Sequence, residues 1–157
     1  MKARETLQTI LHATDLTEHS REALEVACDL ARARKGKLVV LHIVPRLVPA
    51  AVSAGAHELY KAEHFEADLR QYRTEMEQRL EQIQVPDKDI PVDRLIVEGD
   101  VAEEILKFAT SRQCDLIVMG PRAVPDEVLP VLGSAAKEVL QKARCPVVIV
   151  KEPPTIS

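Results

Sequence analysis

The chain is poor in aromatic residues: its 157 residues include two Tyr, two Phe and no Trp. Proteins that bind single-stranded nucleic acid stack bases on aromatic side chains, so this scarcity argues against that class. Acidic residues number 25 and basic residues 21, which gives a net charge of −4. The sequence contains no basic block suited to phosphate backbones or anionic membranes. We therefore expect neither nucleic-acid nor membrane partners.

The chain also lacks paired cysteines and long apolar runs. Cys28, Cys114 and Cys145 lie far apart, form no CxxC pair and have apolar neighbours. This pattern favours buried, reduced thiols, as expected of a cytoplasmic protein. No apolar segment approaches the ~20 residues of a membrane span, and the residues after Met1 do not form a signal-peptide core.

Short apolar, β-branched runs recur along the chain and predict strands. Most are nearly continuous in apolar character, which is typical of strands covered on both faces in a parallel sheet. The predicted strands are Leu7 to Ala13, Leu38 to Val44, Val92 to Val97, Leu116 to Met119 and Val147 to Val150.

Helical periodicity separates the predicted strands. The longest helix has apolar residues at steps of three and four, namely Ala62, Phe65, Leu69, Tyr72, Met76, Leu80 and Ile83. Gly36 is expected to end the first helix, and Asp100 with Glu103 forms a capping-box pattern at the third. The last helix is predicted to begin near Ser134. His12 and His42 fall within predicted strands, which favours hydrogen-bonded, half-buried or buried imidazoles.

This alternation predicts one α/β domain over residues 1–157, with a core from about residue 8 to 151. Its fold class is a doubly wound, five-stranded parallel sheet with helices on both faces. Ligands of such sheets bind beyond the carboxyl ends of the strands, where the strand order reverses. That rule directs attention to Thr14 and Asp15 after the first strand and to Gly120 after the fourth.

Three stretches together resemble the universal stress protein family. The first is Ile10-Leu11-His12-Ala13-Thr14-Asp15-Leu16-Thr17-Glu18-His19-Ser20, and the second is Leu41-His42-Ile43-Val44. The third runs from Met119-Gly120 through Leu132-Gly133-Ser134 to Cys145-Pro146-Val147-Val148-Ile149-Val150. The likeness extends from about Thr9 to Lys151 and rests on the order and spacing of the pieces.

The resemblance implies the adenine nucleotide alpha hydrolase-like fold and a homodimer formed through the strand Val147 to Val150. For one branch of the family it also implies ATP or AMP, with Mg²⁺, bound between the first and fourth strand ends. Asp15 would lie near the ribose or phosphates, and Ile43 would offer its backbone to the adenine. The full set that the resemblance implies is Thr14, Asp15, Ile43, Met119, Gly120, Arg122, Ala123, Gly133, Ser134 and Ala135.

The phosphate loop departs from the pattern of the nucleotide-binding branch, which is Gly, two residues, Gly, nine residues, Gly, then Ser or Thr. Gly120, Gly133 and Ser134 match by spacing, but Ala123 replaces the second glycine. A Cβ there costs roughly 1 kcal/mol if a left-handed backbone is required. Pro121 has no N–H to donate, and the acidic pair Asp126-Glu127 repels phosphate unless a divalent cation intervenes.

Two of the candidate residues also have ordinary structural roles. Ser134 at a helix start can donate to a phosphate oxygen or simply cap the helix. Asp15, between a strand and a helix, can form a turn with Thr17 or contact a ligand. The sequence leaves both pairs of roles open.

Three functions are therefore compared. The first is a dimeric stress-response or signalling module that binds ATP or AMP, with at most slow ATP hydrolysis. The second is an interaction module of the same fold that has lost the nucleotide. The third, an efficient phosphohydrolase, is disfavoured because no metal cluster or general base accompanies Asp15.

Overall fold

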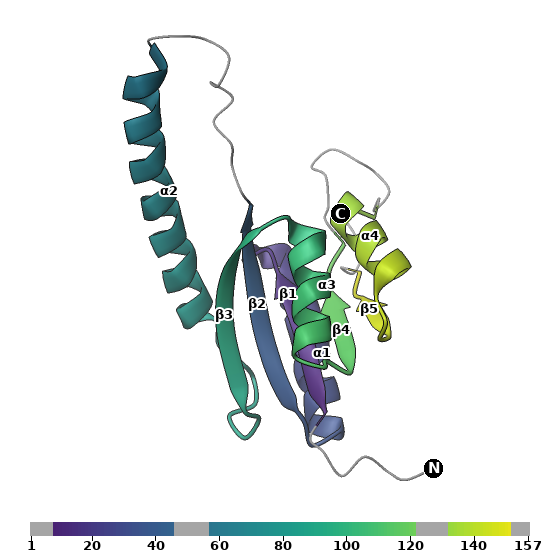
Figure 1. Cartoon of the computed structure of the whole chain (residues 1–157). Coiled ribbons are helices and arrows are strands. Elements are labelled where there is room, and N and C mark those ends of the chain that lie inside the picture. Colours follow the sequence, from purple (N-terminus) through teal and green to yellow (C-terminus); the bar gives the residue numbers. More distant parts are fainter. Residues whose placement is uncertain (1–7, 46–56, 122–131, 152–157) are drawn as a thin grey trace, which may run out of the picture.

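The structure is a computed structural model that describes residues 8–45, 57–121 and 132–151, with only the backbone described at residues 45 and 57–65. Along the chain, strands and helices alternate (Figure 1). The strands are β1 (Thr9–Thr14), β2 (Lys37–Pro45), β3 (Val92–Gly99), β4 (Leu116–Met119) and β5 (Val147–Ile149). The helices are α1 (Arg21–Ala33), α2 (His57–Gln82), α3 (Val101–Ser111) and α4 (Ser134–Lys142), with a 3₁₀ turn at Glu18–Ser20.

The strands form one parallel sheet in the order β3-β2-β1-β4-β5. The chain first winds from β1 to β3 and then returns to the other side of β1, so the order reverses between β1 and β4. Helices α1 and α2 pack on one face of the sheet and α3 and α4 on the other. The predicted doubly wound α/β fold is confirmed.

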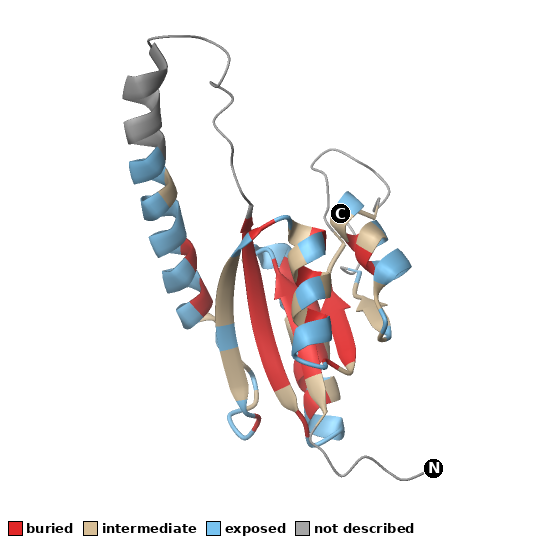
Figure 2. Cartoon of the chain, viewed as in Figure 1, coloured by how far each residue is buried: buried red, intermediate tan, exposed pale blue. Residues whose placement is uncertain are grey.

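Each central strand contributes alternate side chains to two separate cores, and Figure 2 shows these strands largely buried. On β2, Leu38 and Val40 join the α1–α2 core, whereas Val39 and Leu41 join the α3–α4 core. All four are at least nine-tenths buried. This two-sided burial explains why the strands are nearly continuous apolar runs in the sequence.

Two glycines have roles set by close approach or backbone angle. Gly99, with φ of 156°, ends β3 where a Cβ would come within 2.6 Å of Glu104 Cγ. Directly after it, the Asp100 side chain caps α3 by accepting from the Glu103 N–H at 3.0 Å, as predicted. Gly36 does not supply the left-handed residue after α1; Lys35 does, with φ of 51°. Gly36 is instead required because a Cβ there would lie 2.3 Å from the Gln8 carbonyl oxygen.

The C-terminal half of α2 packs against the sheet, and the backbone of its N-terminal half projects past the sheet (Figure 1). Met76 and Leu80 are buried, but Tyr72, on the same apolar stripe, is 38% exposed. Arg73 Nη1 lies 3.9 Å from Glu98 Oε2 on β3, so this part of the helix is beside the carboxyl end of that strand. The side chains of Ala62 and Phe65 lie outside the described part.

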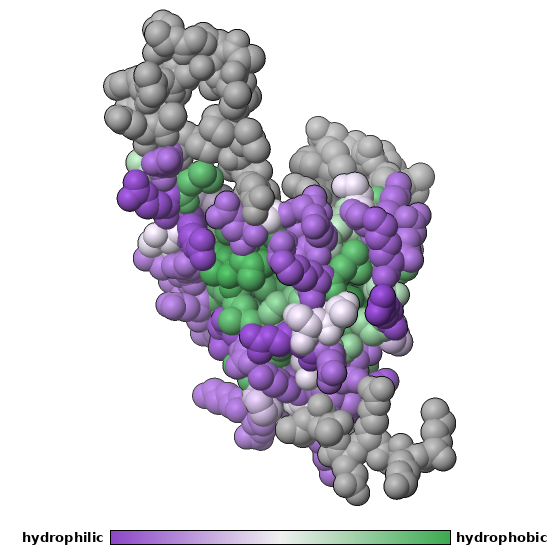
Figure 3. Space-filling model, viewed as in Figure 1, coloured by the Kyte–Doolittle hydropathy of each residue, from purple (hydrophilic) through white to green (hydrophobic). Residues whose placement is uncertain are grey.

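The edges of the sheet are β3 and β5. On β3, Leu95 and Val97 are only partly buried, and apolar surface is visible between α2 and α3 in Figure 3. On β5, all residues from Val147 to Ile149 are half-buried. Leu140 on the neighbouring α4 is 43% exposed although the helical pattern places it on the apolar face. Among the described residues, no helix is both long and apolar enough to cross a membrane.

Candidate functional site

The site lies where the strand order reverses, at the adjacent carboxyl ends of β1 and β4. The register pairs Ala13 with Met119, so Thr14 and Asp15 follow one strand where Gly120 follows the other. A Cβ built on Gly120 would lie 3.4 Å from the His19 carbonyl oxygen in the β1–α1 loop. The two strand ends that the sequence singles out are therefore in contact.

Asp15 is fixed by hydrogen bonds to a single carboxylate oxygen. Its Oδ1 accepts from the Thr17 N–H at 2.9 Å, from Thr17 Oγ1 at 2.6 Å and from Ser20 Oγ at 2.6 Å. No described residue donates to Oδ2. The turn with Thr17, one of the two roles left open by the sequence, is therefore present. It leaves the second oxygen available to a ligand hydroxyl or a cation.

These bonds keep Asp15 ionised. Removal from water raises the pKa of its carboxyl group, but the hydrogen bonds from Ser20 and Thr17 outweigh that effect and hold the pKa below its usual value. Leu16, the next residue, has φ of 62°, a backbone angle that side chains with a Cβ rarely adopt. A charged, exposed carboxylate is thus held in a locally strained loop at the switch point of the sheet.

Two buried histidines tie the strands together beneath this loop. His42 Nδ1 donates to the Thr14 carbonyl oxygen at 2.9 Å, and His12 Nδ1 donates to the Val118 carbonyl oxygen at 3.1 Å. Because a carbonyl only accepts, Nδ1 carries the proton in both rings. The predicted hydrogen-bonded, buried histidines are confirmed. Together they link β2 to β1 and β1 to β4.

The two imidazoles differ in detail. Burial lowers the pKa of His12 to about 4, against the opposing hydrogen bond to Val118, so this ring is neutral at neutral pH. His42 is only 5% exposed, and its Nε2 has no hydrogen-bond partner within the described residues. A buried polar atom without a partner costs roughly 1–3 kcal/mol, so the hydrogen bond from His42 to the Thr14 carbonyl oxygen is made at some cost in stability.

Several candidate side chains already have partners inside the protein. Thr14 is buried, and its Oγ1 accepts from the Leu16 N–H at 3.0 Å. The side chains of Ile43 and Met119 lie in the α3–α4 core, and the Met119 carbonyl accepts from the Val150 N–H at 2.9 Å. Contacts of these three residues with a ligand would therefore use other backbone groups.

Ile43 has a backbone position that suits such a contact. The last registered pair between β1 and β2 joins Thr14 to His42, and β2 continues to Pro45. Ile43 therefore lies one residue past the end of β1 along the sheet edge facing the site.

The start of α4 supplies a second polar element. Gly133 is the N-cap residue, with extended backbone angles, and no side chain caps the helix. Ser134 is exposed and Ala135 half-buried. The predicted start of this helix at Ser134 is confirmed. Its first N–H groups and the positive end of its dipole are arranged as in helix termini that bind anions.

The middle of the loop lies outside the described residues. It contains the predicted contacts Arg122 and Ala123 as well as the acidic pair Asp126-Glu127. The structure therefore brings together Thr14, Asp15, Ile43, Met119 and Gly120 at one sheet edge. Gly133, Ser134 and Ala135 lie on α4, whose first residues are at the same upper end of the molecule in Figure 1.

A groove of about 810 Å³ lies on the α1–α2 side of the β1–α1 loop. His12 and Thr14 line it together with Arg21 at the start of α1 and Arg79 near the end of α2. No motif in the sequence points to this groove, because its walls come from segments that only the fold brings together.

Sequence reasoning missed Ser20 as a site residue. Its hydroxyl is buried and bonds both to Asp15 Oδ1 and to the Asp15 N–H, the latter at 3.3 Å. The only available signal was a serine five residues after Asp15, just before a predicted helix.

The fold and site define a doubly wound α/β protein with a candidate anion and nucleotide site at its switch point. Residues 6–151 match the model of the universal stress protein family. The chain is 31% identical over 145 residues to universal stress protein YxiE of Bacillus subtilis, covering 90% of this chain and 97% of the relative. It is 32% identical to a universal stress protein of Thermus aquaticus, with 92% and 98% covered. The chain therefore belongs to the universal stress protein family.

Solved structures agree with this fold. The structure of MJ0577, a universal stress protein of Methanocaldococcus jannaschii, superposes with a TM-score of 0.70 at 27% identity, covering 94% of this chain and 98% of that one. A universal stress protein in complex with cAMP has a TM-score of 0.58 at 20% identity, with 94% and 98% covered. One from Archaeoglobus fulgidus in complex with dAMP has a TM-score of 0.56 at 17% identity, with 92% and 97% covered.

Proposed function

We propose that the chain binds an adenine nucleotide, ATP or AMP, between the carboxyl ends of β1 and β4. The observation that carries the proposal is Asp15. Its carboxylate is held ionised through Oδ1, while Oδ2 has no hydrogen bond from a described residue. Adenine nucleotides on other members of the family, cAMP in one structure and dAMP in another, support this choice of ligand.

The chemistry of the described residues fits such a ligand. In the proposal, Asp15 Oδ2 accepts from a ribose hydroxyl or contacts a Mg²⁺ ion, and the backbone at Ile43 meets the adenine. Gly120 offers its backbone, without a side chain, where β1 and β4 end, and the uncapped N–H groups after Gly133 bind phosphate oxygens. Arg122 and Ala123 belong to the proposed contacts but lie in the part of the loop that is not described.

Magnesium would be held mainly by the nucleotide. Among the described residues, no group of three or more His, Cys, Asp or Glu side chains is placed to bind a metal ion. Mg²⁺ commonly keeps several waters and takes one or two carboxylates plus substrate phosphates, so a single carboxylate at Asp15 suffices. With no further acid or base proposed beside it, hydrolysis would be slow at most.

The proposal extends to assembly and location. β5 is an edge strand of half-buried apolar residues, and such an edge invites aggregation unless it is paired. We propose that Val147 to Val150 pairs with the same strand of a second copy about a two-fold axis. The dimer would act in the cytoplasm as a stress-response module, a location that suits a chain whose three cysteines are free thiols in the structure.

The direct test is to denature the purified protein and identify released nucleotide by mass spectrometry and ultraviolet absorbance. With no Trp and two Tyr, the protein contributes little absorbance. We expect AMP or ATP from the wild type and a large loss from Asp15→Asn. Asp93→Asn, at an exposed ion pair with Lys37 near the start of β3, is the matched control and should retain the nucleotide.

Protein that carries no nucleotide and takes up none when it is added would contradict the proposal. The alternative of an interaction module without nucleotide would then be favoured.

A further inference from the structure

Two of the three cysteines occupy equivalent positions at the amino ends of neighbouring strands. Cys114 lies two residues before β4, and Cys145 lies two residues before β5. Both pack into the α3–α4 core, with Cys114 7% exposed and Cys145 half-buried. Cys28 is different: it is fully buried in the α1–α2 core on the other face of the sheet.

The strand register places these two cysteines side by side. β4 and β5 pair in parallel with Ile117 opposite Val147, and the Ile117 N–H donates to the Pro146 carbonyl oxygen at 3.0 Å. Two residues further back, Asp115 falls opposite Cys145, and Cys114 is one residue beyond. A strand spacing of ~4.8 Å and a rise of ~3.3 Å then give a Cα separation of about 6 Å, within the range that a disulfide spans. Both residues precede the regular strands, and both side chains lie on the same face of the sheet, in the α3–α4 core.

Electrostatics shows the same proximity. Burial raises the pKa of the Cys114 thiol to about 11, and the next cause is the neighbouring charge of Cys145. Asp115 raises the pKa of both thiols, whereas Arg112 lowers that of Cys114. The charge of a Cys145 thiolate therefore acts on Cys114 and opposes its ionisation.

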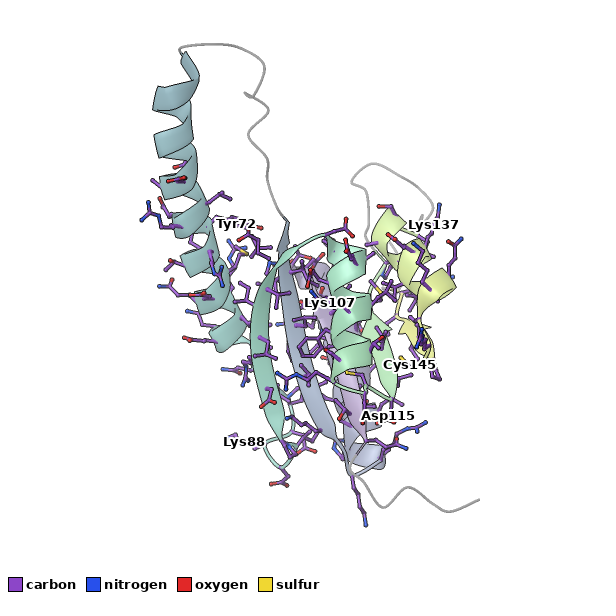
Figure 4. All side chains as sticks on the ribbon, viewed as in Figure 1. Tyr72, Lys88, Lys107, Asp115, Lys137 and Cys145 are labelled. Carbon is purple, nitrogen blue, oxygen red and sulfur yellow. The ribbon has the colours of Figure 1, made fainter. Side chains whose placement is uncertain are left out.

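The pair is also reachable from solvent. Cys114 and Cys145 line a groove of about 840 Å³ between the C-terminal ends of α3 and α4. Figure 4 shows Cys145 near the lower ends of β4 and β5, close to Asp115. Three cationic residues, Arg112, Lys142 and Arg144, also line this groove. They suit a small anionic oxidant better than a neutral one.

We propose that Cys114 and Cys145 form an intramolecular disulfide by exchange with an anionic low-molecular-weight disulfide such as oxidised glutathione. The more exposed Cys145, as the thiolate, attacks one sulfur of glutathione disulfide and releases one glutathione thiolate. Cys114, as the thiolate, then attacks Cys145 Sγ and releases the second. Two protein thiols are oxidised and one small disulfide is reduced to two thiols; the two protons lost by the protein thiols are taken up by the released glutathione thiolates.

The bond would close a ring that runs from Cys114 to Cys145. That ring contains β4, the whole stretch from Gly120 to Ser134 and α4. It would fasten the edge strand β5 to β4 at the end of the sheet opposite the candidate nucleotide site. The inference does not depend on nucleotide binding.

The test treats the full-length protein with oxidised glutathione, blocks the remaining thiols and digests with trypsin. Cys114 and Cys145 fall in separate tryptic peptides, 113–122 and 145–151, and Cys28 falls in a third, 22–32. We expect peptides 113–122 and 145–151 joined, with the intact mass lower by two hydrogen atoms. Cys28→Ser is the matched control and should give the same linked pair.

The single variants separate the two steps. Cys114→Ser should stop at a stable glutathione adduct on Cys145, and Cys145→Ser should show neither adduct nor link at the same exposure. Wild-type protein that accumulates the glutathione adduct on Cys145 while Cys114 stays a free thiol would overturn the proposal. The proposal would also be overturned if both thiols of the wild type stay free under oxidation conditions that convert Cys114→Ser to its glutathione adduct.

Discussion

The hydroxyl of Ser20 donates a hydrogen bond to Asp15 Oδ1 at 2.6 Å and so joins the start of α1 to the carboxyl end of β1. The Asp15 N–H bonds back to Ser20 Oγ at 3.3 Å. This reciprocal pair fixes the loop that faces Gly120. It also stabilises the charged form of Asp15.

Replacing Ser20 with alanine should therefore raise the Asp15 pKa towards its ordinary value and cost about 1–2 kcal/mol of unfolding free energy at neutral pH. Because the folded pKa of Asp15 is depressed, its stabilising effect is present above the unfolded pKa and is lost as pH falls through the folded pKa. Urea unfolding at several pH values and an NMR titration of Asp15 measure both effects. The difference in stability between wild type and variant should shrink as pH falls through the folded pKa of Asp15.

Ser111→Ala is the control for that experiment. Ser111 donates only to the Phe108 carbonyl oxygen at 3.2 Å, on the exposed end of α3. Removing this hydroxyl should lower the free energy of unfolding by about 0.5 kcal/mol or less and leave the Asp15 pKa unchanged. Equal losses from the two variants would contradict the role given to Ser20.

His12 should make the protein sensitive to acid. The pKa of His12 is about 4 in the folded state and about 6.5 for an unperturbed histidine, so the unfolded chain takes up a proton more readily. Stability should accordingly fall as pH drops from about 6.5 to 4, by an amount on the order of 3 kcal/mol. His12→Asn keeps a donor for the Val118 carbonyl but does not titrate. Its unfolding free energy should change less over this range; parallel curves for wild type and variant would refute the role of His12.

Much of this architecture can be predicted from the sequence, because each strand and helix has its own local pattern of apolar residues. The order of elements, the Asp100 cap and the start of α4 all depend on neighbouring residues. The projection of α2 past the sheet cannot be predicted in this way. Tyr72 continues the apolar stripe of Met76 and Leu80, and the length of the sheet that faces α2 decides where the packing stops.

The rest of the site depends on long-range register. The bond from His42 to the Thr14 carbonyl requires β1 and β2 to be paired in one alignment, and the sequence contains no signal for that alignment. The neighbourhood of Cys114 and Cys145 likewise follows from the pairing of β4 with β5. Viewed in sequence, these cysteines are simply two separate apolar positions.

The proposed dimer predicts a specific sensitivity at β5. Val148 lies on this edge strand and pairs with Val118 of β4. The Val150 N–H donates to β4, so the Val148 N–H two residues earlier faces β4 as well; a proline at Val148 should detach β5 from the sheet and give monomer or insoluble protein by light scattering. Val92→Pro, at the first residue of the opposite edge strand β3, should stay dimeric. A soluble Val148→Pro protein that remains fully dimeric would exclude this interface.

The disulfide proposal predicts a steep dependence on pH. Thiolate is the attacking species and the pKa of both thiols is raised, to about 11 at Cys114. The surrounding charges are Asp115, Arg112, Lys142 and Arg144. The rate of linkage by oxidised glutathione should therefore rise about tenfold between pH 7 and pH 8. A rate independent of pH would show that the reacting thiol is already ionised, against the environment described.

Calorimetric titration with Mg-ATP, repeated with AMP, tests the central claim most directly. Gly120→Ala is the sharpest variant, because the added methyl would meet the His19 and Val150 carbonyl oxygens at 3.4 and 3.9 Å, ordinary contacts that spare the fold, and would add a side chain where β1 and β4 end. We expect saturable binding by the wild type and binding weaker by about tenfold or more in Gly120→Ala and Asp15→Asn, with thermal stability of Gly120→Ala unchanged. No heat and no thermal shift for the wild type at millimolar nucleotide would contradict the account.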